Sequence, residues 1–384
     1  MELDDILKFA RTAGASDVHI KAGLPPVYRI DGELKPLIKA PRLTQEMTEE
    51  MAIKIMSAKQ RLRYDDIHEI DMAYGVPGLG RFRVNIFAQR GTVSMVFRFI
   101  PFDIKDLDDL ILPPVIKKII AEKRGLVLVT GATGSGKSTT LAAMIDYINT
   151  NSTVHIVTIE DPIEFLHRDR KSIINQREVG TDTENYANAL RSALRQDPDV
   201  ILLGEMRDIE TMEIAMHAAE TGHLVFSTLH TIDASESINR IVGSFPPHHQ
   251  RQIRAQLSAV LKAVISQRLV PKIDGKGRVP AVEVMVSTAR VRELIDDPEK
   301  TSLLSDTIQQ GYVSYGMQSF DQSLMSLLKR NLISYEEAVL QSSNPDDFKL
   351  KFSGISSTSD LSWDNFDTGA DENDGEKGKK IERF

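Results

Sequence analysis

The nine residues from Gly131 to Thr139 constrain this chain more than any other stretch. They spell Gly-Ala-Thr-Gly-Ser-Gly-Lys-Ser-Thr and match the phosphate-binding pattern G-x-x-x-x-G-K-[ST]. The apolar, β-prone run Leu126–Val129 precedes the pattern, and a stretch with apolar residues at helical spacing follows it. Glycines let backbone N–H groups curl around an anion, and the new helix points its unpaired N–H groups at the same place. The sequence therefore predicts a strand, a phosphate-binding loop and a helix.

Each residue type in this loop has a physical task. Lys137 is expected to reach the β- and γ-phosphates of ATP, and the Ser138 hydroxyl is expected to ligate Mg²⁺. The alternative is a glycine-rich turn that binds nothing, and the strand, lysine and helix together disfavour it. The expected nucleotide-binding residues are Gly131, Ala132, Thr133, Gly134, Ser135, Gly136, Lys137, Ser138 and Thr139.

Composition limits the remaining classes of function. The 384 residues have room for two or three domains, and the absence of cysteine excludes disulfides and thiolate zinc sites. The net charge of −8 gives no electrostatic footprint for DNA, so we expect no nucleic-acid partner. No apolar run is long enough to span a bilayer, and the first residues lack the features of a signal peptide. We therefore expect a cytoplasmic protein.

Residues 1–100 are expected to form a small α+β domain. Leu3, Ile6, Leu7 and Ala10 lie on one helical face, and Thr44 is placed to cap a second helix. Short strands are expected at 17–20 and 26–30, and longer ones from Arg81 and over 93–100, where apolar and polar residues alternate. Residues 101–114, with three prolines and an acidic patch, are expected to form a linker.

Residues 115–270 alternate apolar strands with helical stretches, which predicts an α/β domain with a mostly parallel sheet. Strands are expected at 126–130, 155–159, 200–203 and 224–228. Residues 271–352 are expected to be mostly helical, and 353–384 to be a disordered acidic tail. Trp363 and Phe366 in this tail allow a short docking motif.

Polar residues follow three of the expected strands, at the edge where α/β sheets bind ligands. Glu160 follows the second strand, Glu205 the third and His230 the fourth. Glu205 is expected to polarise the attacking water, Glu160 to help order Mg²⁺ or its waters, and His230 to sense the γ-phosphate. For each residue alone, a solvated glutamate or a structural histidine remains the alternative. The expected metal-site residues are Ser138, Glu160 and Glu205.

Phosphoryl transfer also needs a cation that stabilises charge on the transferred oxygens. Arg191, Arg195 and Arg207 flank the third strand, and Arg240 lies further along. In a ring, one or two of them would act on the neighbouring subunit's nucleotide, and Arg195 and Arg207 are the expected catalytic members. The alternative is that these arginines form salt bridges within the chain.

Four blocks of sequence in this order resemble the secretion-superfamily ATPases. They are Gly131–Thr139, Ile159–Glu164, Asp197–Glu205 and Thr221–His230, which are similar to that family's Walker A, Asp box, Walker B and His box. Gly14–Ile20 and Gly316–Asp321 are similar to its PilT/PilU branch, the type IV pilus retraction motors. The resemblance covers about residues 1–350.

This resemblance implies a PAS-like N-terminal domain joined to a RecA-like ATPase domain, assembled into a homohexamer. It implies that ATP hydrolysis moves the domains and acts on an inner-membrane pilus platform protein, beside a paralogous retraction ATPase. It also places the protein at the inner face of the cytoplasmic membrane. Arg83, with Arg81 and Arg98 on the same sheet face, would lie near the bound nucleotide, although a solvated sheet face explains these arginines too.

Other functions remain as alternatives. An assembly or type II secretion ATPase usually carries extra N-terminal domains and a four-cysteine zinc insert, whereas this chain has no cysteine. A RecA-like nucleic-acid translocase conflicts with the acidic net charge. A scaffold that binds ATP without hydrolysis conflicts with the complete acidic and histidine blocks. The family's retraction motif corresponds at best to Ala289–Ile295, and the acidic tail is more like the accessory PilU type, so principal and accessory motor both remain open.

Overall fold

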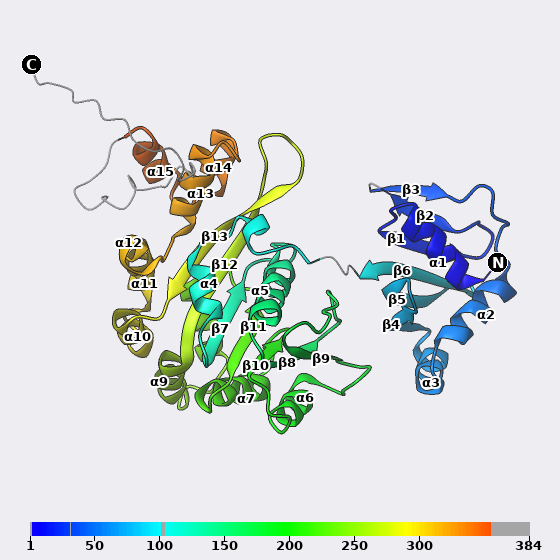
Figure 1. Cartoon of the computed structure of the whole chain (residues 1–384), viewed down its shortest axis with the longest axis horizontal. Coiled ribbons are helices and arrows are strands. Elements are labelled where there is room, and N and C mark those ends of the chain that lie inside the picture. Colours follow the sequence, from blue (N-terminus) through cyan, green and yellow to red (C-terminus); the bar gives the residue numbers. More distant parts are fainter. Residues whose placement is uncertain (1, 31, 101–103, 355–384) are drawn as a thin grey trace, which may run out of the picture.

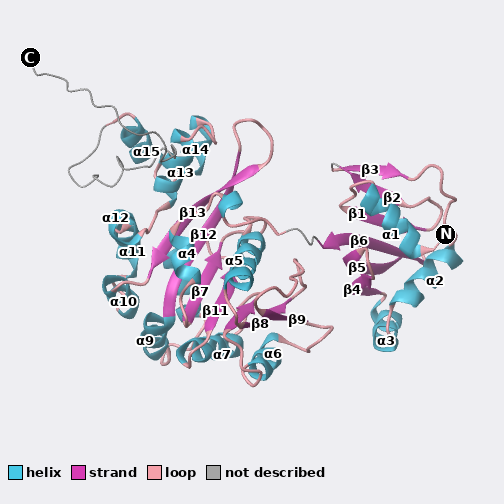
Figure 2. Cartoon of the chain, in the orientation of Figure 1, coloured by secondary structure: helices cyan, strands magenta, loops and turns pink. Residues whose placement is uncertain are grey.

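The computed structural model describes residues 2–30, 32–100 and 104–354. Figures 1 and 2 show two lobes, with the smaller N-terminal lobe on the right. The larger lobe is built around one twisted sheet, and a group of C-terminal helices lies on the side away from the N-terminal lobe (Figure 1). The expected tail, with Trp363 and Phe366, lies outside the described residues from 355 onward.

The N-terminal domain is an antiparallel sheet with helices against it. The strand order is β3-β2-β1-β6-β5-β4. Its elements are α1 (Leu3–Thr12), β1 (Asp17–Lys21), β2 (Val27–Ile30), β3 (Glu33–Pro36), α2 (Gln45–Ile55), α3 (Ala58–Ile67), β4 (Glu69–Val76), β5 (Gly80–Gln89) and β6 (Thr92–Ile100).

The core of this domain follows the periodicities in the sequence. Leu3, Ile6, Leu7 and Ala10 are the buried face of α1, and Thr44 caps α2 by accepting the Met47 N–H, as expected. On β5 the side chains alternate, so that Phe82, Val84 and Ile86 are buried while Arg81, Arg83 and Asn85 lie on the opposite face. This alternation leaves a polar arginine face on β5.

The second lobe contains a seven-stranded sheet in the order β13-β12-β7-β11-β10-β8-β9. All neighbouring strands are parallel except β12 and β13, which form an antiparallel pair. The strands are β7 (Gly125–Thr130), β8 (His155–Glu160), β9 (Ile173–Glu178), β10 (Val200–Leu203), β11 (Leu224–Leu229), β12 (Leu261–Pro271) and β13 (Arg278–Val286). The four strands expected from the sequence are confirmed, and β9, β12 and β13 are additional.

Helices cover both faces of this sheet (Figure 1). Alternate residues of β7 point to opposite faces: Leu126 and Leu128 pack in one apolar cluster, Val127 and Val129 in another. The first cluster joins α6 (Tyr186–Ala193), α7 (Ile209–Glu220), α8 (Ala234–Gly243) and α9 (Gln250–Val260); the second joins α4 (Val115–Ile120) and α5 (Lys137–Asn151). Burial on both faces explains the continuous apolar runs of the parallel strands. The expected α/β architecture is confirmed.

The C-terminal helices pack on the β12–β13 pair, on α9 and on one another. They are α10 (Ala289–Asp296), α11 (Leu304–Gln310), α12 (Tyr312–Tyr315), α13 (Phe320–Lys329), α14 (Tyr335–Gln341) and α15 (Pro345–Phe352). A 3₁₀ turn at Thr301–Leu303 lies between α10 and α11, and another at Asp108–Leu110 precedes α4. Phe320 and Leu324 of α13 share a buried cluster with Val279 and Ala281 of β13. The sheet therefore continues to Val286, beyond residue 270, where the sequence placed the end of the ATPase core.

The segment between the lobes is partly attached to the second lobe. Leu107 is buried in the same cluster as α4 and α5, and Leu110 and Leu112 pack against that cluster. The later part of the expected linker, residues 101–114, thus belongs to the larger lobe. Among the described residues, no helix has both the length and the apolar character needed to cross a bilayer.

Candidate active site

The loop from Gly131 to Gly136 has a backbone that only glycine fits at several positions. Gly131, Gly134 and Gly136 have φ angles of 140°, 80° and 94°. A Cβ at Gly131 would come within 2.4 Å of the Gln267 carbonyl oxygen and 2.6 Å of Ser135 Oγ. Helix α5 starts at Lys137, directly after the last of these glycines. The glycines therefore shape a tight loop whose exit is a helix N-terminus.

Lys137 folds over this loop. Its Nζ donates hydrogen bonds to the carbonyl oxygens of Gly131 at 2.8 Å and Ala132 at 3.1 Å. Burial lowers the pKa of Lys137, and the nearby carboxylates of Glu205 and Glu164 act in the opposite direction. The ammonium group is thus held at the concave side of the loop, where a bound anion would meet it.

A cleft of about 530 Å³ opens next to the loop and brings four separate sequence blocks together. Residues of the loop and α5 line one side: Thr133, Gly134, Gly136, Lys137, Ser138, Thr139, Leu141 and Ala142. Residues from the ends of β8, β10 and β11 line the remainder, with others from nearby segments: Glu160, Asp161, Pro162, Glu164, Phe165, His167, Tyr186, Leu202, Gly204, Glu205, Arg207, Thr228, His230, Leu269 and Arg278. The cleft lies at the carboxyl ends of the parallel strands, as the sequence predicts.

Glu205 occupies the centre of the polar contacts in this cleft. Its Oε2 accepts a hydrogen bond from Arg207 Nε at 2.7 Å, and its Oε1 lies 3.4 Å from His230 Nε2. Only 18% of the Glu205 side chain is exposed. The hydrogen bond to Glu205 raises the pKa of Arg207, so this arginine remains charged. Glu205 is therefore held from two sides by cationic or ionisable partners.

Gly204 precedes Glu205 at a point where two strand ends lie close. A Cβ at this position would approach the Tyr186 hydroxyl at 3.1 Å and the Ile159 carbonyl oxygen at 3.2 Å. The Gly204 carbonyl accepts a hydrogen bond from Thr228 Oγ1 at 2.5 Å. Glycine thus allows β8, β10 and β11 to converge at the floor of the cleft.

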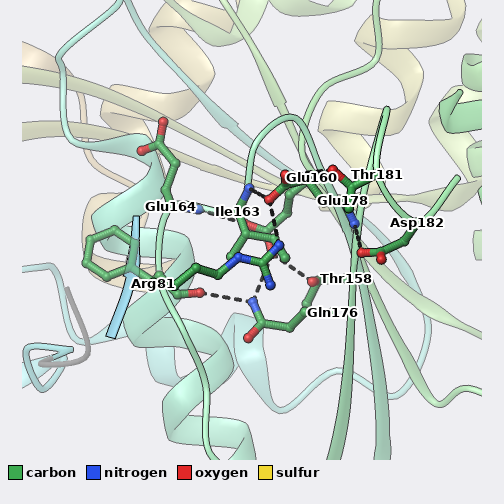
Figure 3. Close-up of polar contacts among 10 residues, drawn as sticks. Arg81, Thr158, Glu160, Ile163, Glu164, Gln176, Glu178, Thr181 and Asp182 are labelled. Carbon is green, nitrogen blue, oxygen red and sulfur yellow. Dashed lines mark hydrogen bonds and ion pairs between the residues drawn. The ribbon is translucent and has the colours of Figure 1, made fainter. Parts of the chain in front are cut away.

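Glu160 is held by neutral partners rather than by a cation. Thr158 Oγ1 and Gln176 Nε2 donate to Glu160 Oε1 at 2.7 and 3.1 Å, as Figure 3 shows. Burial raises the pKa of Glu160, and these two hydrogen bonds oppose the shift. A divalent cation in the cleft would remove the cost of burying this charge.

The loop after Glu160 is anchored by polar side chains of the edge strand β9. Glu178 Oε2 accepts the Ile163 N–H at 3.3 Å, and Gln176 donates to the Phe165 carbonyl at 2.9 Å. Asp182 in turn accepts the N–H of Glu178 at 2.8 Å (Figure 3). The edge strand therefore fixes the loop that forms one side of the cleft.

One arginine of the N-terminal sheet reaches this anchor. Arg81 Nη2 lies 3.1 Å from Glu178 Oε2, an ion pair that joins the two lobes (Figure 3). Arg83 lines a neighbouring pocket that shares Asp161 with the main cleft. Arg98 turns instead to Asp17, with Nε 2.8 Å from Oδ1, and does not line the cleft. None of the three arginines lines the cleft itself: Arg81 contacts the anchoring residue Glu178, and Arg83 lines the neighbouring pocket.

Comparison with known proteins identifies the family of this chain. The sequence family described as "Type II/IV secretion system protein" matches residues 2–301. The type IV pilus retraction ATPase PilT of Pseudomonas aeruginosa is 47% identical over 91% of this chain and 100% of its own length. The chain is a PilT/PilU-like ATPase. Its relatives include the type IV pilus ATPase PilU of the same organism, 43% identical over 91% of each chain.

Solved structures of this family have the same fold. A crystal structure of the pilus retraction motor PilT with bound ADP aligns with a TM-score of 0.82 and 49% identity, covering 90% of this chain and 98% of that one. The ATPase DotB of Legionella pneumophila aligns with a TM-score of 0.77 and 29% identity, covering 92% and 96%. The two-lobed architecture is therefore that of the family.

Of the four arginines expected to supply a catalytic cation, Arg191, Arg195 and Arg240 lie outside the cleft of this PilT/PilU-like chain. Arg195 is exposed and donates to the Arg191 carbonyl at 3.1 Å, and Arg191 forms an ion pair with Glu210. Arg240 is exposed in the last turn of α8. Arg207 does line the cleft, in the same-chain ion pair with Glu205. Arg195 thus remains a candidate for action on a neighbouring subunit.

Several residues that line the cleft or anchor its loop gave no usable signal in the sequence. Gln176 and Glu178 lie on β9, an edge strand without regular apolar alternation. Tyr186 and His167 lie in segments between the recognised blocks, and Arg278 comes from β13. Only the β-branched pair Ile173–Ile174 hints at β9. The supporting residues of the site are therefore the ones that sequence patterns miss.

The oxygen-rich cleft fits Mg²⁺. Ser138 in the first turn of α5 and the carboxylates of Glu160 and Glu205 line the same cleft, and oxygen is the ligand that Mg²⁺ prefers. Within the described residues, no three His, Asp or Glu side chains form a metal-binding group. This agrees with a cation held by one or two protein groups together with phosphates and water rather than by a protein cage.

Proposed function

We propose that this chain is the ATP-hydrolysing motor subunit of a hexameric ring that retracts type IV pili. The single observation that carries the proposal is the cleft itself, where Lys137 and Ser138 lie with Glu205 and His230. Similarity to the PilT retraction ATPase over its entire length supports the cellular role.

The phosphate-binding side of the cleft positions the substrate. Backbone N–H groups of the loop and the start of α5 bind the phosphates, and Lys137 places its charge at the β- and γ-phosphates. Ser138, with Glu160 or Glu205, would hold Mg²⁺. When bound, this ion neutralises the phosphate charge that develops during transfer.

Residues on the opposite side of the cleft activate the attacking water. Glu205 polarises the attacking water, and its two neighbours hold the carboxylate in place. His230 lies close enough to Glu205 to report the presence of a γ-phosphate to the segment that follows it. Glu160 accepts hydrogen bonds from Thr158 and Gln176 on Oε1, and these bonds would hold its carboxylate in place for a cation in the cleft.

Hydrolysis is linked to movement by residues that connect the two lobes or that face a neighbouring subunit. Arg81 connects the N-terminal sheet to Glu178, next to the loop that borders the cleft. Arg83 lies near Asp161, and Arg195 is exposed and free to meet a neighbouring subunit in a homohexamer. Such a ring would act in the cytoplasm, at the inner face of the membrane, on a pilus platform protein beside a paralogous retraction ATPase.

A combined biochemical and genetic experiment tests this proposal. The purified full-length chain should release phosphate from ATP only with Mg²⁺, and Glu205→Gln should retain ATP binding while kcat falls by about 10²–10³-fold. In the organism that carries the gene, deletion should cause pili to accumulate. Restoring the wild-type gene should reverse this, and restoring Glu205→Gln should not.

The outcomes separate the alternatives. Loss of pili on deletion would indicate an assembly motor and overturn the retraction proposal. A Glu205→Gln enzyme with the unmutated rate would refute the role of Glu205. A wild-type chain that releases phosphate only when a paralogue is added would indicate the accessory, PilU-like subunit.

A further inference from the structure

The segment that carries His230 has a buried support outside the cleft. Helix α8 starts at Ala234, four residues after His230. The backbone N–H of Ala234 donates a hydrogen bond to Glu283 Oε1 on β13 at 2.9 Å. The first N–H groups of a helix have no partner within the helix, and where they are buried another group must accept their hydrogen bonds. Glu283 does this from a site where it is only 7% exposed.

The residues between His230 and α8 are tied to the start of this helix. Thr231 Oγ1 and Ser237 Oγ lie 2.6 Å apart, and Ser237 Oγ also donates to the Asp233 carbonyl at 2.6 Å. Glu236 accepts the Ile232 N–H at 2.8 Å. We call residues 230–234 the His loop. Because the loop and the first turn of α8 share these bonds, fixing Ala234 fixes the loop.

The same strand pair also contacts the phosphate-binding loop. Glu283 lies directly opposite Ser266 on β12. Thr130, the residue before Gly131, donates from its Oγ1 to Ser266 Oγ at 2.9 Å. The β12–β13 pair therefore supports both the entry of the phosphate-binding loop and the exit of the His loop.

We propose that Glu283 is a positioning residue for ATP hydrolysis, which holds the start of α8 so that His230 stays in place beside Glu205. Glu283 touches neither the cleft nor the expected substrate, so its effect passes through the His loop. The proposal rests on the proposed function, because it requires His230 and Glu205 to act in hydrolysis.

Because Glu283 can ionise, the hydrogen bond that it accepts from the start of α8 depends on pH. Burial raises its pKa to about 7, and Asp233 and Asp321 add to the shift, while the Ala234 N–H and Arg268 oppose it. The other charged groups on α8 and α11, namely Glu236, Arg240 and Asp306, are exposed. An ionised carboxylate accepts a stronger hydrogen bond and faces the positive end of α8. The support should therefore strengthen as pH rises through about 7.

Steady-state kinetics of the full-length chain with Mg-ATP between pH 6 and 8.5 test this. Glu283→Gln keeps an acceptor for the Ala234 N–H but cannot ionise, so the ratio of wild-type to variant kcat should rise about threefold or more through pH 7. Glu283→Ala removes the acceptor and should lower kcat by about 10–100-fold, with KM nearly unchanged. Glu336→Gln removes the same charge from an exposed position and is the matched control.

Hydrogen exchange gives a readout that does not depend on activity. The Ala234 amide should exchange about tenfold faster in Glu283→Ala than in the wild type, and Glu283→Gln should restore most of the protection. A kcat ratio between wild type and Glu283→Gln that stays constant with pH would overturn the proposal, as would wild-type kcat in Glu283→Ala. If the wild type itself releases no phosphate, the proposed function fails, while the exchange rates still report whether Glu283 supports the loop.

Discussion

The two sides of the cleft are built in different ways. The phosphate wall, Gly131–Thr139, is one contiguous segment whose shape is set by positive φ angles at three glycines and by the close packing of Gly131. The acidic wall, comprising the loop 160–167 with Glu205, Arg207 and His230, is assembled from side chains of several strands and loops. Its members are held by ion pairs and hydrogen bonds to one another. The phosphate wall is thus held by its backbone conformation. The acidic wall is held by side-chain contacts that can exchange partners.

This difference fits a motor. A rigid phosphate wall binds the constant part of the substrate in every state. The acidic wall must respond when the γ-phosphate is lost, and ion pairs such as Arg207–Glu205 and Arg81–Glu178 can change partner without unfolding anything. Substitutions in the first wall should therefore act on binding, and those in the second on turnover, stability or pH dependence.

The largest effect is expected in the phosphate wall. Lys137→Ala removes the only wall side chain that carries a positive charge, so ATP turnover should fall by about 10³-fold or more, and nucleotide affinity should fall with it. Phosphate release and binding of a fluorescent ATP analogue measure the two effects. Lys118→Ala, at a position outside the cleft, is the control. Normal affinity in Lys137→Ala would mean that the backbone alone binds the phosphates.

A smaller effect with a defined pH range is expected at His167 in the acidic wall. Burial, with Arg170 nearby, lowers the pKa of His167 to about 4. The folded protein therefore binds fewer protons than the unfolded chain between about pH 4 and 6.5, so the stability that neutral His167 contributes is present above 6.5 and is lost as pH falls toward 4. Between pH 7.5 and pH 5, the free energy of unfolding should fall by about 2 kcal/mol more in the wild type than in His167→Gln.

Urea unfolding of both proteins at the two pH values measures this difference. His217→Gln places the same substitution at an exposed histidine and serves as the control. Equal losses in the wild type and His167→Gln would show that the imidazole is not buried in neutral form, and the acidic wall would be more open than described.

The smallest effect is expected for the ion pair between the lobes. Arg81→Ala leaves Glu178 with the Ile163 N–H and the Thr181 hydroxyl, so the free energy of unfolding should fall by only about 1 kcal/mol or less. Glu178→Ala leaves those donors without their acceptor, so the free energy of unfolding should fall by about 2–3 kcal/mol. Denaturant melts compare the two variants. Equal losses would mean that the ion pair, rather than the loop anchor, dominates the stabilisation at Glu178.

The contrast between the walls also explains what sequence analysis could achieve. The phosphate wall was predicted residue by residue, because its function depends on a fixed local order of glycines and lysine. Glu160, Glu205 and His230 were predicted because they follow apolar strands, and the cleft brings them together. Gln176, Glu178 and Glu283 were not predicted. Their tasks depend on which segments the sheet places side by side, and that order is not visible in local periodicity.

The C-terminal region shows the same limit of sequence analysis. Residues 271–352 were expected to be mostly helical, and Leu324 and Leu327 are buried on α13. The hairpin partner β13 was missed because its apolar run resembles any buried segment until β12 is placed next to it. Roles that require a second subunit, such as that proposed for Arg195, stay predictions.

The crowding around Gly204 limits how this enzyme can change. A methyl group there would press on the Tyr186 hydroxyl and on the backbone of the adjacent strand, so both would have to shift by a few tenths of an ångström. A substitution that adds a second carboxylate beside Glu205 therefore requires the ends of β8 and β10 to move. Variation of the catalytic rim is thus coupled to the spacing of these two strands.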